Sequence, residues 1–297
     1  MLHGAQTFDK ADSARTRAIT ASHPIRRAEA QPVQPRAIGT AILHVAGDAS
    51  GQTRLRDLRT SGAMKLVFPR QTDHVEAVIV NTAGGVTGGD ALSVAATAED
   101  GARLTLTTQA AERAYRAQPG QTGQVTTRLT VASGARLFWL PQELILFEGC
   151  ALTRRLDIDL AEDAALLMVE PVVLGRTAMK ESLHDIAFRD RIAIRRDGRP
   201  LYIDGTDLVG DAMRHLSRRA IGAGAGAYAS LVLVSPDAGQ HLSSIRADLP
   251  ATAGASLIAP DSLAMRLLAA DGFALRASLL PLLDRLTGGA LPRSWRL

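Results

Sequence analysis

The sequence feature that most constrains the fold is a strand–turn–strand unit that occurs four times between residues 92 and 203. In each unit, two stretches rich in aliphatic and β-branched residues flank a short turn with acidic or glycine residues. Alternation such as LDIDL at residues 156–160 turns one face of a strand inward and the other toward solvent. Successive units are about 30–35 residues apart, a spacing typical of stacked repeats. The four turns are centred near Asp100, Gly134, Asp163 and Asp197.

This repeat predicts a mainly β protein in which stacked hairpins bury a continuous core between layers, with mostly strand over residues 37–204. The spacing leaves open whether the layers form a β-helix or a sandwich. Residues 205–297 change character and predict a small mixed α/β portion, with a strand at 228–234 and a helical tendency at 238–248. The leucine period near the C-terminus predicts a helix that begins near Leu280, with Pro281 in its first turn.

Composition bounds the class of protein. Residues 1–36 are rich in Ala, Arg, Gln and Pro, so we expect a mostly disordered leader, followed by one β-rich domain over residues 37–297. Cys150 is the single cysteine, which excludes an internal disulfide and suits a reducing cytoplasm. No apolar run reaches the roughly 18 residues of a membrane span, and the N-terminus lacks the apolar stretch of a secretory signal. We therefore expect a cytoplasmic protein that is not bound to a membrane.

The net charge of +4 comes largely from scattered arginine pairs, such as Arg154-Arg155. A nucleic-acid-binding face usually concentrates such charge and adds stacking aromatic residues, which are only 4% of this chain. The charge pattern favours a moderately basic docking surface for an acidic protein partner.

A glycine-rich run, NTAGGVTGGD at residues 81–90, connects two predicted strands. It lacks the lysine of a phosphate-binding P-loop. A dinucleotide-binding fingerprint requires a helix directly after its glycines, whereas the residues that follow this run are predicted to be extended. Glycine is needed where the backbone has positive φ or approaches another segment closely. The pattern alone favours a tight bend beside packed backbone over a functional loop. We expect at least two of its glycines to meet one of these conditions: Gly84, Gly85, Gly88 and Gly89.

The run at 81–90 resembles the signature of the urease accessory protein family UreD, also called UreH. Further segments agree with that family in the same order, from about Ala37 to the end of the chain. They are TTQAA leading to Tyr115-Arg116, WLPQE at 139–143 leading to Phe147-Glu148-Gly149, LGR at 174–176 before Glu181, and LPRSW at 291–295. The glycine-rich run and the WLPQE segment, with Glu143, are the specific parts.

The resemblance implies a β-helical architecture and a scaffold that is not an enzyme. It implies partners: apo-urease (UreA, UreB and UreC), UreF and the GTPase UreG, with UreE as an indirect source of nickel. The resemblance also implies that this complex supports GTP-dependent nickel delivery to the urease active site. GTP would belong to UreG, since the P-loop is missing here, and no cofactor is expected to bind tightly to this chain.

Four carboxylates are candidates for a nickel path. Glu170 interrupts the apolar run 166–174, and a buried carboxylate must be paired, hydrogen-bonded or in contact with water. Pairing with an arginine such as Arg176 and a functional role remain equally open. Glu112, Glu143 and Glu170 each follow the second strand of a unit, so stacking predicts that they align along the axis. Oxygen ligands hold Ni²⁺ weakly, as a conduit requires. We therefore predict a polar internal passage for hydrated nickel, lined or bordered by Asp90, Glu112, Glu170 and Asp204.

Other functions remain as alternatives. The seven histidines form no His-x-His or His-x-x-x-His pattern, so no tight metal site is predicted. One alternative is a β-rich hydrolase or amidase that uses Cys150, which an active Cys150→Ala protein would exclude. The other is a basic nucleic-acid-binding β-solenoid, which salt-independent binding would exclude.

Overall fold

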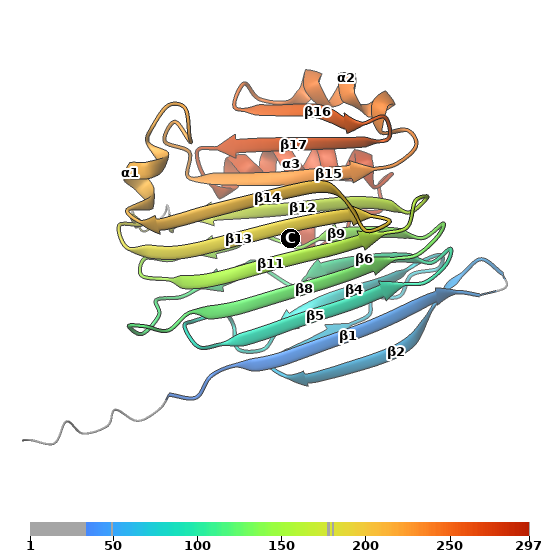
Figure 1. Cartoon of the computed structure of the whole chain (residues 1–297), viewed down its shortest axis with the longest axis horizontal. Coiled ribbons are helices and arrows are strands. Elements are labelled where there is room, and N and C mark those ends of the chain that lie inside the picture. Colours follow the sequence, from blue (N-terminus) through green and yellow to red (C-terminus); the bar gives the residue numbers. More distant parts are fainter. Residues whose placement is uncertain (1–33, 49, 177–178, 180, 297) are drawn as a thin grey trace, which may run out of the picture. The chain divides into compact units, whose positions relative to one another are not determined.

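The computed structural model describes residues 34–48, 50–176, 179 and 181–296, of which residues 36–296 lie in one unit. All but the last three residues of the predicted leader, 1–36, lie outside the described residues. The strands alternate between two sheets that face each other (Figure 1).

The first sheet has seven strands in the order β14-β13-β11-β8-β5-β1-β2. Strands β1, β5, β8, β11 and β13 run parallel in register, while β2 and β14 pair antiparallel at the two edges. Its strands are β1 (Ile38–Gly47), β2 (Thr53–Gly62), β5 (Ala91–Ala98), β8 (Gly123–Val131), β11 (Ala151–Leu160), β13 (Ile186–Arg196) and β14 (Arg199–Gly210).

The second sheet has the path β16-β17-β15-β12-β9-β6-β4-β3, and the short strands β7 and β10 pair beside it. Strands β4, β6, β9 and β12 are parallel, and β15, β17 and β16 extend the sheet antiparallel from β12. Its strands are β3 (Met64–Val67), β4 (Val75–Asn81), β6 (Arg103–Thr108), β7 (Glu112–Ala114), β9 (Arg136–Leu140), β10 (Leu144–Leu146), β12 (Ala165–Leu174), β15 (Ala227–Val234), β16 (Ala253–Ala259) and β17 (Ser262–Ala269).

This arrangement is a β-solenoid of about 4 turns, so the mainly β prediction is confirmed and the choice between β-helix and sandwich is decided by the parallel stacks. The four predicted turns lie where the sequence places them, between consecutive strands. The hairpin interpretation is wrong for the first three units. Their turns carry the chain from one sheet to the other, and the turn backbone pairs with the next layer, as in Gly101 N to Ser133 O at 2.9 Å. Of the four units, only the fourth, made of β13 and β14, is an antiparallel hairpin.

The predicted change of character at residue 205 is also wrong in position, because β14 continues to Gly210. Among the described residues, three α-helices follow, α1 (Ala212–Leu216), α2 (Ala238–Asp248) and α3 (Gly272–Leu286), and then a short 3-10 helix (Arg293–Arg296). Helix α3 begins eight residues before the predicted start at Leu280 and contains Pro281 in its interior. Asp271 fixes the true start, because its side chain accepts a hydrogen bond from the N–H of Ala274 at 2.8 Å.

Two apolar clusters stabilise the fold. The larger fills the space between the sheets and includes Leu43, Leu106 and Leu129, each at most 1% exposed. The smaller lies between the outer face of the second sheet and helices α2 and α3. Large aromatic residues are few, and the inner cluster is built mainly from Leu, Ile, Val and Ala.

Candidate functional site

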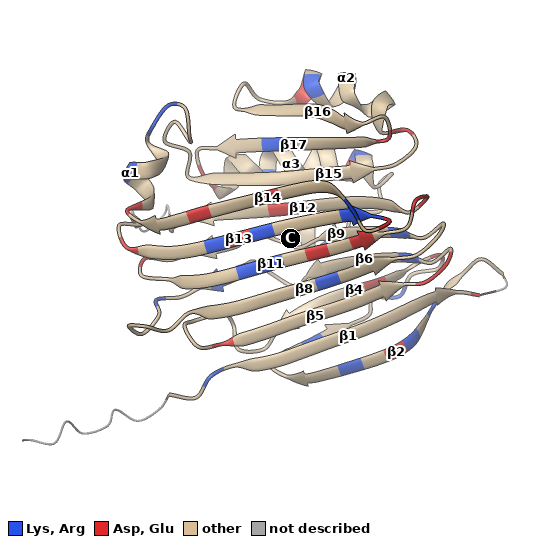
Figure 2. Ribbon diagram, in the orientation of Figure 1, with Lys and Arg blue, Asp and Glu red and all other residues tan. Residues whose placement is uncertain are grey.

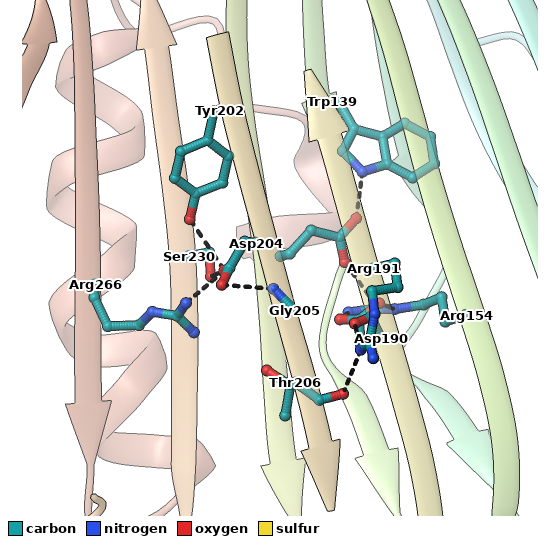
Figure 3. Close-up of polar contacts among 11 residues, drawn as sticks. Trp139, Arg154, Asp190, Arg191, Tyr202, Asp204, Gly205, Thr206, Ser230 and Arg266 are labelled. Carbon is teal, nitrogen blue, oxygen red and sulfur yellow. Dashed lines mark hydrogen bonds and ion pairs between the residues drawn. The ribbon is translucent and has the colours of Figure 1, made fainter. Parts of the chain in front are cut away.

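A buried cluster of ionised side chains interrupts the apolar core between the sheets. Arg154 on β11 and Asp190 on β13 are register partners in the first sheet, and Glu170 reaches them from β12 in the second. Figure 3 shows Trp139, Arg154 and Asp190 converging there. Arg154 lies 2.6 Å from Glu170 Oε2 and binds both oxygens of Asp190, at 3.0 and 2.5 Å. The indole N–H of Trp139 donates to Glu170 Oε1 at 2.6 Å.

These contacts decide how Glu170 is accommodated. The pairing with Arg176 suggested by the sequence is wrong, because Arg176 binds Glu181 at 2.9 Å instead. Burial raises the pKa of the Glu170 carboxyl, and the charge of Arg154 opposes that rise. The pKa of Arg154 is raised because Asp190 and Glu170 outweigh its desolvation, so the guanidinium stays charged. One cation therefore serves two carboxylates in a space largely shielded from water.

A second polar group lies beside the first. Asp204 on β14 accepts hydrogen bonds from Tyr202 at 3.0 Å and Ser230 at 3.1 Å, and it forms an ion pair with Arg266 (Figure 3). Ser230 is the register partner of Glu170 on one side and of Arg266 on the other. The Asp204 carboxylate thus joins the edge of the first sheet to the row that contains Glu170.

The two groups border one small enclosed space. Its wall includes Glu170, Asp190, Asp204 and Tyr228, and it has no room for a water molecule. The Tyr228 hydroxyl is buried and has no hydrogen-bond partner among the described residues. Burial, with the nearby charge of Asp190, raises the pKa of Tyr228. A buried hydroxyl without a hydrogen-bond partner is unusual in a native protein.

A separate internal cavity of about 90 Å³ lies on the other side of Glu170 and extends to Glu112. Asn81 donates to Glu112 Oε2 at 3.1 Å, and burial raises the pKa of the Glu112 carboxyl. Most of the wall between the two carboxylates is apolar, so this part of the predicted polar passage is polar mainly at its ends. The apolar wall residues include Met64, Ile79, Leu92, Val94, Leu144, Leu152 and Leu156.

The small space also adjoins the surface. A groove of about 410 Å³ shares Gly205, Thr206 and Tyr228 with it and is bordered by Arg266. Three spaces thus follow one another from Glu112, past Glu170 and Asp204, to the surface between β14 and β17. Glu170 is common to the first two spaces. The guanidinium groups of Arg154 and Arg266 form ion pairs with Glu170 and Asp204 beside these spaces.

Neither Asp90 nor Glu143 lines any of the three spaces, although the charge of Asp90 is near enough to Glu112 to help raise the pKa of that carboxyl. The Asp90 carboxylate accepts the backbone N–H groups of Ala37 and Thr87, both at 2.8 Å. Glu143 binds Arg276 of α3 at 3.0 Å, outside the solenoid. The predicted alignment of Glu112, Glu143 and Glu170 is wrong. Glu112 pairs in register with Leu144, which pairs with Val172, so Glu143 is one residue out of step and faces the opposite side of the sheet.

The glycine-rich run supports the same region. Gly84, Gly85 and Gly89 have positive φ, so the conformational prediction is confirmed. A Cβ on Gly85 would lie 2.2 Å from the ring of Tyr115, and one on Gly88 would lie 2.7 Å from Cβ of Ala117. Asn81, at the start of the run, donates both to Gly85 O and to Glu112. The run is therefore a close-packed bend, and its first residue, Asn81, holds the Glu112 carboxylate.

Sequence reasoning missed Arg154, Asp190, Tyr228 and Arg266. A usable signal existed for the first two. Arg154 occupies an inward position in the alternation Leu152, Arg154, Leu156, and Asp190 does so between Phe188 and Ile192. A charged residue at an inward position of a strand is costly to bury unless it is paired. Two such positions in adjacent units predict an internal ion pair.

The alternative chemistry of Cys150 finds no support in its surroundings. Its side chain is buried, and burial raises the pKa of the thiol to about 12, whereas a nucleophilic cysteine needs a stabilised thiolate. Within residues 34–48, 50–176, 179 and 181–296, no group of three or more His, Cys, Asp or Glu side chains is arranged to hold a metal ion. None of the helices in that part of the chain is long and apolar enough to cross a membrane.

These features define the class: a two-sheet β-solenoid with a charged cluster in its interior. Comparison with known proteins then identifies the family. The model of the UreD urease accessory protein family matches residues 38–296, so the chain belongs to that family.

Several urease accessory proteins UreD are similar over most of their length. The one from Roseobacter denitrificans is 53% identical over 264 residues, which cover 89% of this chain and 96% of the relative. The one from Ruegeria sp. is 54% identical over 271 residues, covering 89% and 91%. The one from Rhizobium etli is 43% identical over 249 residues, covering 83% and 91%.

Proposed function

We propose that this chain is a scaffold in urease maturation. It binds apo-urease (UreA, UreB and UreC) and, together with UreF and the GTPase UreG, supports GTP-dependent incorporation of nickel into the urease active site. UreE supplies nickel upstream. The family assignment supports the role in urease maturation. Nickel is cargo in this proposal, and the chain itself carries out no chemical conversion.

The observation that carries the finer proposal is the succession of spaces bordered by Glu112, Glu170 and Asp204. Carboxylate oxygens with water bind Ni²⁺ less tightly than imidazole or thiolate ligands do, so an ion can both enter and leave. We omit Asp90 from the route because two backbone N–H groups occupy its carboxylate.

In this proposal the route is closed while it holds no ion, because arginine side chains occupy the places beside its carboxylates. Arg154 and Arg266 neutralise the carboxylates while no ion is present, which avoids the cost of unpaired buried charge. An arriving cation would replace a guanidinium beside Glu170 or Asp204. The half-exposed side chain of Arg266 can then turn toward the surface groove, whereas Arg154 keeps its second partner, Asp190.

The test uses Glu170→Gln and Asp204→Asn, which keep side-chain shape and remove charge. Asp90→Asn is the matched control, because the Asp90 side chain lines none of the three spaces. Each variant is matured with the full set of urease proteins. Nickel content and urease activity are measured, and the partners are recovered by pull-down. We expect the two route variants to retain partner binding but to lower nickel loading, while Asp90→Asn loads nickel normally if it folds. Full nickel occupancy in both route variants would exclude the route. Loss of partner binding would show that these carboxylates are structural.

A further inference from the structure

Strand β2 is an open edge of the first sheet. It ends the strand order, with β1 on one side and no strand of the described chain on the other (Figure 1). Every side chain from Arg54 to Arg59 is exposed. A ten-residue strand with a free edge presents a row of backbone N–H and C=O groups that another extended chain can pair with.

The inner face of this strand is unusually apolar for an exposed position. Leu58 and Leu55 pair in register with Leu43 and Val45 of β1, which are buried in the core. Leu55 and Leu58 are nevertheless 43% and 41% exposed, because nothing in the described chain covers the end of the solenoid beyond them. An added strand would cover both leucines and extend the core by one layer.

The same segment carries an excess of positive charge, visible as blue bands along β2 in Figure 2. Arg54 pairs with Asp48, whereas four further basic residues in residues 53–70 form no ion pair within the described residues: Arg56, Arg59, Lys65 and Arg70. Asp57 is the single acidic residue in that stretch. An acidic chain would complement this surface.

The opposite edge of the same sheet differs. On β14 and its neighbour β13, Asp207 pairs with Arg191 at 2.5 Å and Arg189 at 3.8 Å. Asp204 ties the inner face of β14 to Arg266 of the second sheet. Charge on that edge is thus largely neutralised internally, whereas charge on β2 is left available. Arginines can also serve only to prevent edge-to-edge aggregation, which is the competing interpretation.

We propose that the β2 surface, residues 54–59 with Lys65 and Arg70, docks an acidic, extended segment of a protein partner by strand addition. Backbone pairing with β2 supplies the affinity, the two leucines receive apolar side chains, and the arginines select acidic neighbours. The inference rests on the proposed function in one respect: the partners to be tested are apo-urease and the other maturation proteins. It is independent of the nickel route.

The test is a binding titration of the full chain with purified apo-urease, UreF and UreG, each alone and in combination. The parent is compared with the double variant Arg56→Glu/Arg59→Glu and with Arg128→Glu/Arg199→Glu, a control with the same charge change at exposed positions elsewhere. A conservative variant, Arg56→Lys/Arg59→Lys, keeps the charge. Hydrogen exchange of the β2 amides is followed in the free chain and in the complex that binds.

We expect the Arg56→Glu/Arg59→Glu variant to bind one partner about tenfold or more weakly than the parent chain does. The lysine variant and the control variant should bind that partner as tightly as the parent. Binding by the parent should weaken as the salt concentration rises. Alternate β2 amides should become protected in that complex. Unchanged affinity for every partner, or no protection of β2 in any complex, would overturn the proposal and leave the arginines as edge protection. Protection that depends on the concentration of this chain alone would show a second copy on β2 and would also overturn it. Nickel loading by the Glu170 and Asp204 variants is a separate measurement, so failure of one proposal is distinguishable from failure of the other.

Discussion

Trp295 donates its indole N–H to the carbonyl oxygen of Leu140 at 2.9 Å, which joins two sequence motifs 155 residues apart. Arg276 lies over the Trp295 ring at 5.1 Å from its centroid and binds Glu143 at 3.0 Å. The C-terminal LPRSW motif and the WLPQE motif are therefore two halves of one contact. Together they hold α3 and the C-terminal residues against the second sheet.

This contact predicts that Trp295 is a major source of stability. The side chain is fully buried. Trp295→Ala should lower the free energy of unfolding by about 3–5 kcal/mol, because it leaves a large cavity. Trp295→Phe should cost less, since it keeps most of the apolar contact and loses the hydrogen bond, about 1 kcal/mol. Urea unfolding of the purified chain measures both. Equal stability of the alanine variant and the parent would show that the C-terminal motif does not hold the fold together.

The parts of the fold that depend on local chemistry could be predicted, and the parts that depend on distant pairing could not. Alternation and turn residues locate the strands and the turns near Asp100, Gly134 and Asp163. Whether a turn closes a hairpin or crosses to another sheet depends on which strand becomes the neighbour, which no local pattern encodes. The contact of Asp204 with Arg266 across 62 residues is of the same kind.

The candidate site shows the same division. Glu170 and Glu112 stand out because a carboxylate in an apolar run must have a partner. The actual partner of Glu170 is Arg154 on the facing sheet. Arg176, which is closer in the sequence, pairs with Glu181 instead. Glu143 departs from the predicted alignment with Glu112 and Glu170, because a shift of one position along a strand reverses the face of the side chain.

A pH dependence follows from the pKa of Glu112. Burial raises the pKa of this carboxyl above its usual 4.5, so the folded state holds the proton more tightly than the unfolded state. The stability that this group contributes is complete below the unfolded pKa and is lost as the pH rises through the folded pKa. Glu112→Gln removes the penalty, so its stability relative to the parent should be higher at pH 8 than at pH 4, measured by urea unfolding.

Glu181 provides the control of opposite sign. Hydrogen bonds from Arg176 lower the pKa of the Glu181 carboxyl. Its contribution is present above the unfolded pKa and is lost as the pH falls through the folded pKa. Glu181→Gln should therefore be less stable than the parent at pH 7 and should approach it in acid. The same pH trend in both variants would contradict the assignment for Glu112.

The glycine-rich run predicts a difference between two neighbouring glycines. Both Gly84 and Gly85 have positive φ, but a Cβ on Gly84 meets no atom within 4 Å. Gly84→Ala should cost about 1–2 kcal/mol from backbone strain alone. Gly85→Ala should cost more, because its Cβ would also displace the Tyr115 ring and would lie 2.7 Å from Arg113 O. Thermal unfolding of both variants compares them, and a Gly85 variant as stable as the Gly84 variant would contradict the close packing.

The surroundings of Cys150 predict an unreactive thiol. Because burial raises its pKa to about 12, very little thiolate exists at pH 8, and the side chain is shielded from reagents. Ellman's reagent should react with the native protein only as fast as the chain opens, and at once in urea. Cys150→Ala should still support urease activation. Rapid native labelling together with loss of activation in the alanine variant would revive a catalytic role.

The buried charge cluster supports the strongest prediction. Arg154→Met leaves Glu170 and Asp190 in the core without their cation, and such a change typically lowers stability by about 3–5 kcal/mol. The neighbouring Arg155 is half-exposed and pairs with Asp157, so Arg155→Met should cost about 0–1 kcal/mol. The triple variant Arg154→Met/Glu170→Gln/Asp190→Asn removes the unpaired charges and should recover much of the lost stability. Urea unfolding gives all three values. If Arg154→Met lowers the free energy of unfolding no more than Arg155→Met does, the three side chains do not form the buried, mutually dependent set of charges that their distances indicate. The proposal that Arg154 closes the route would then also be wrong.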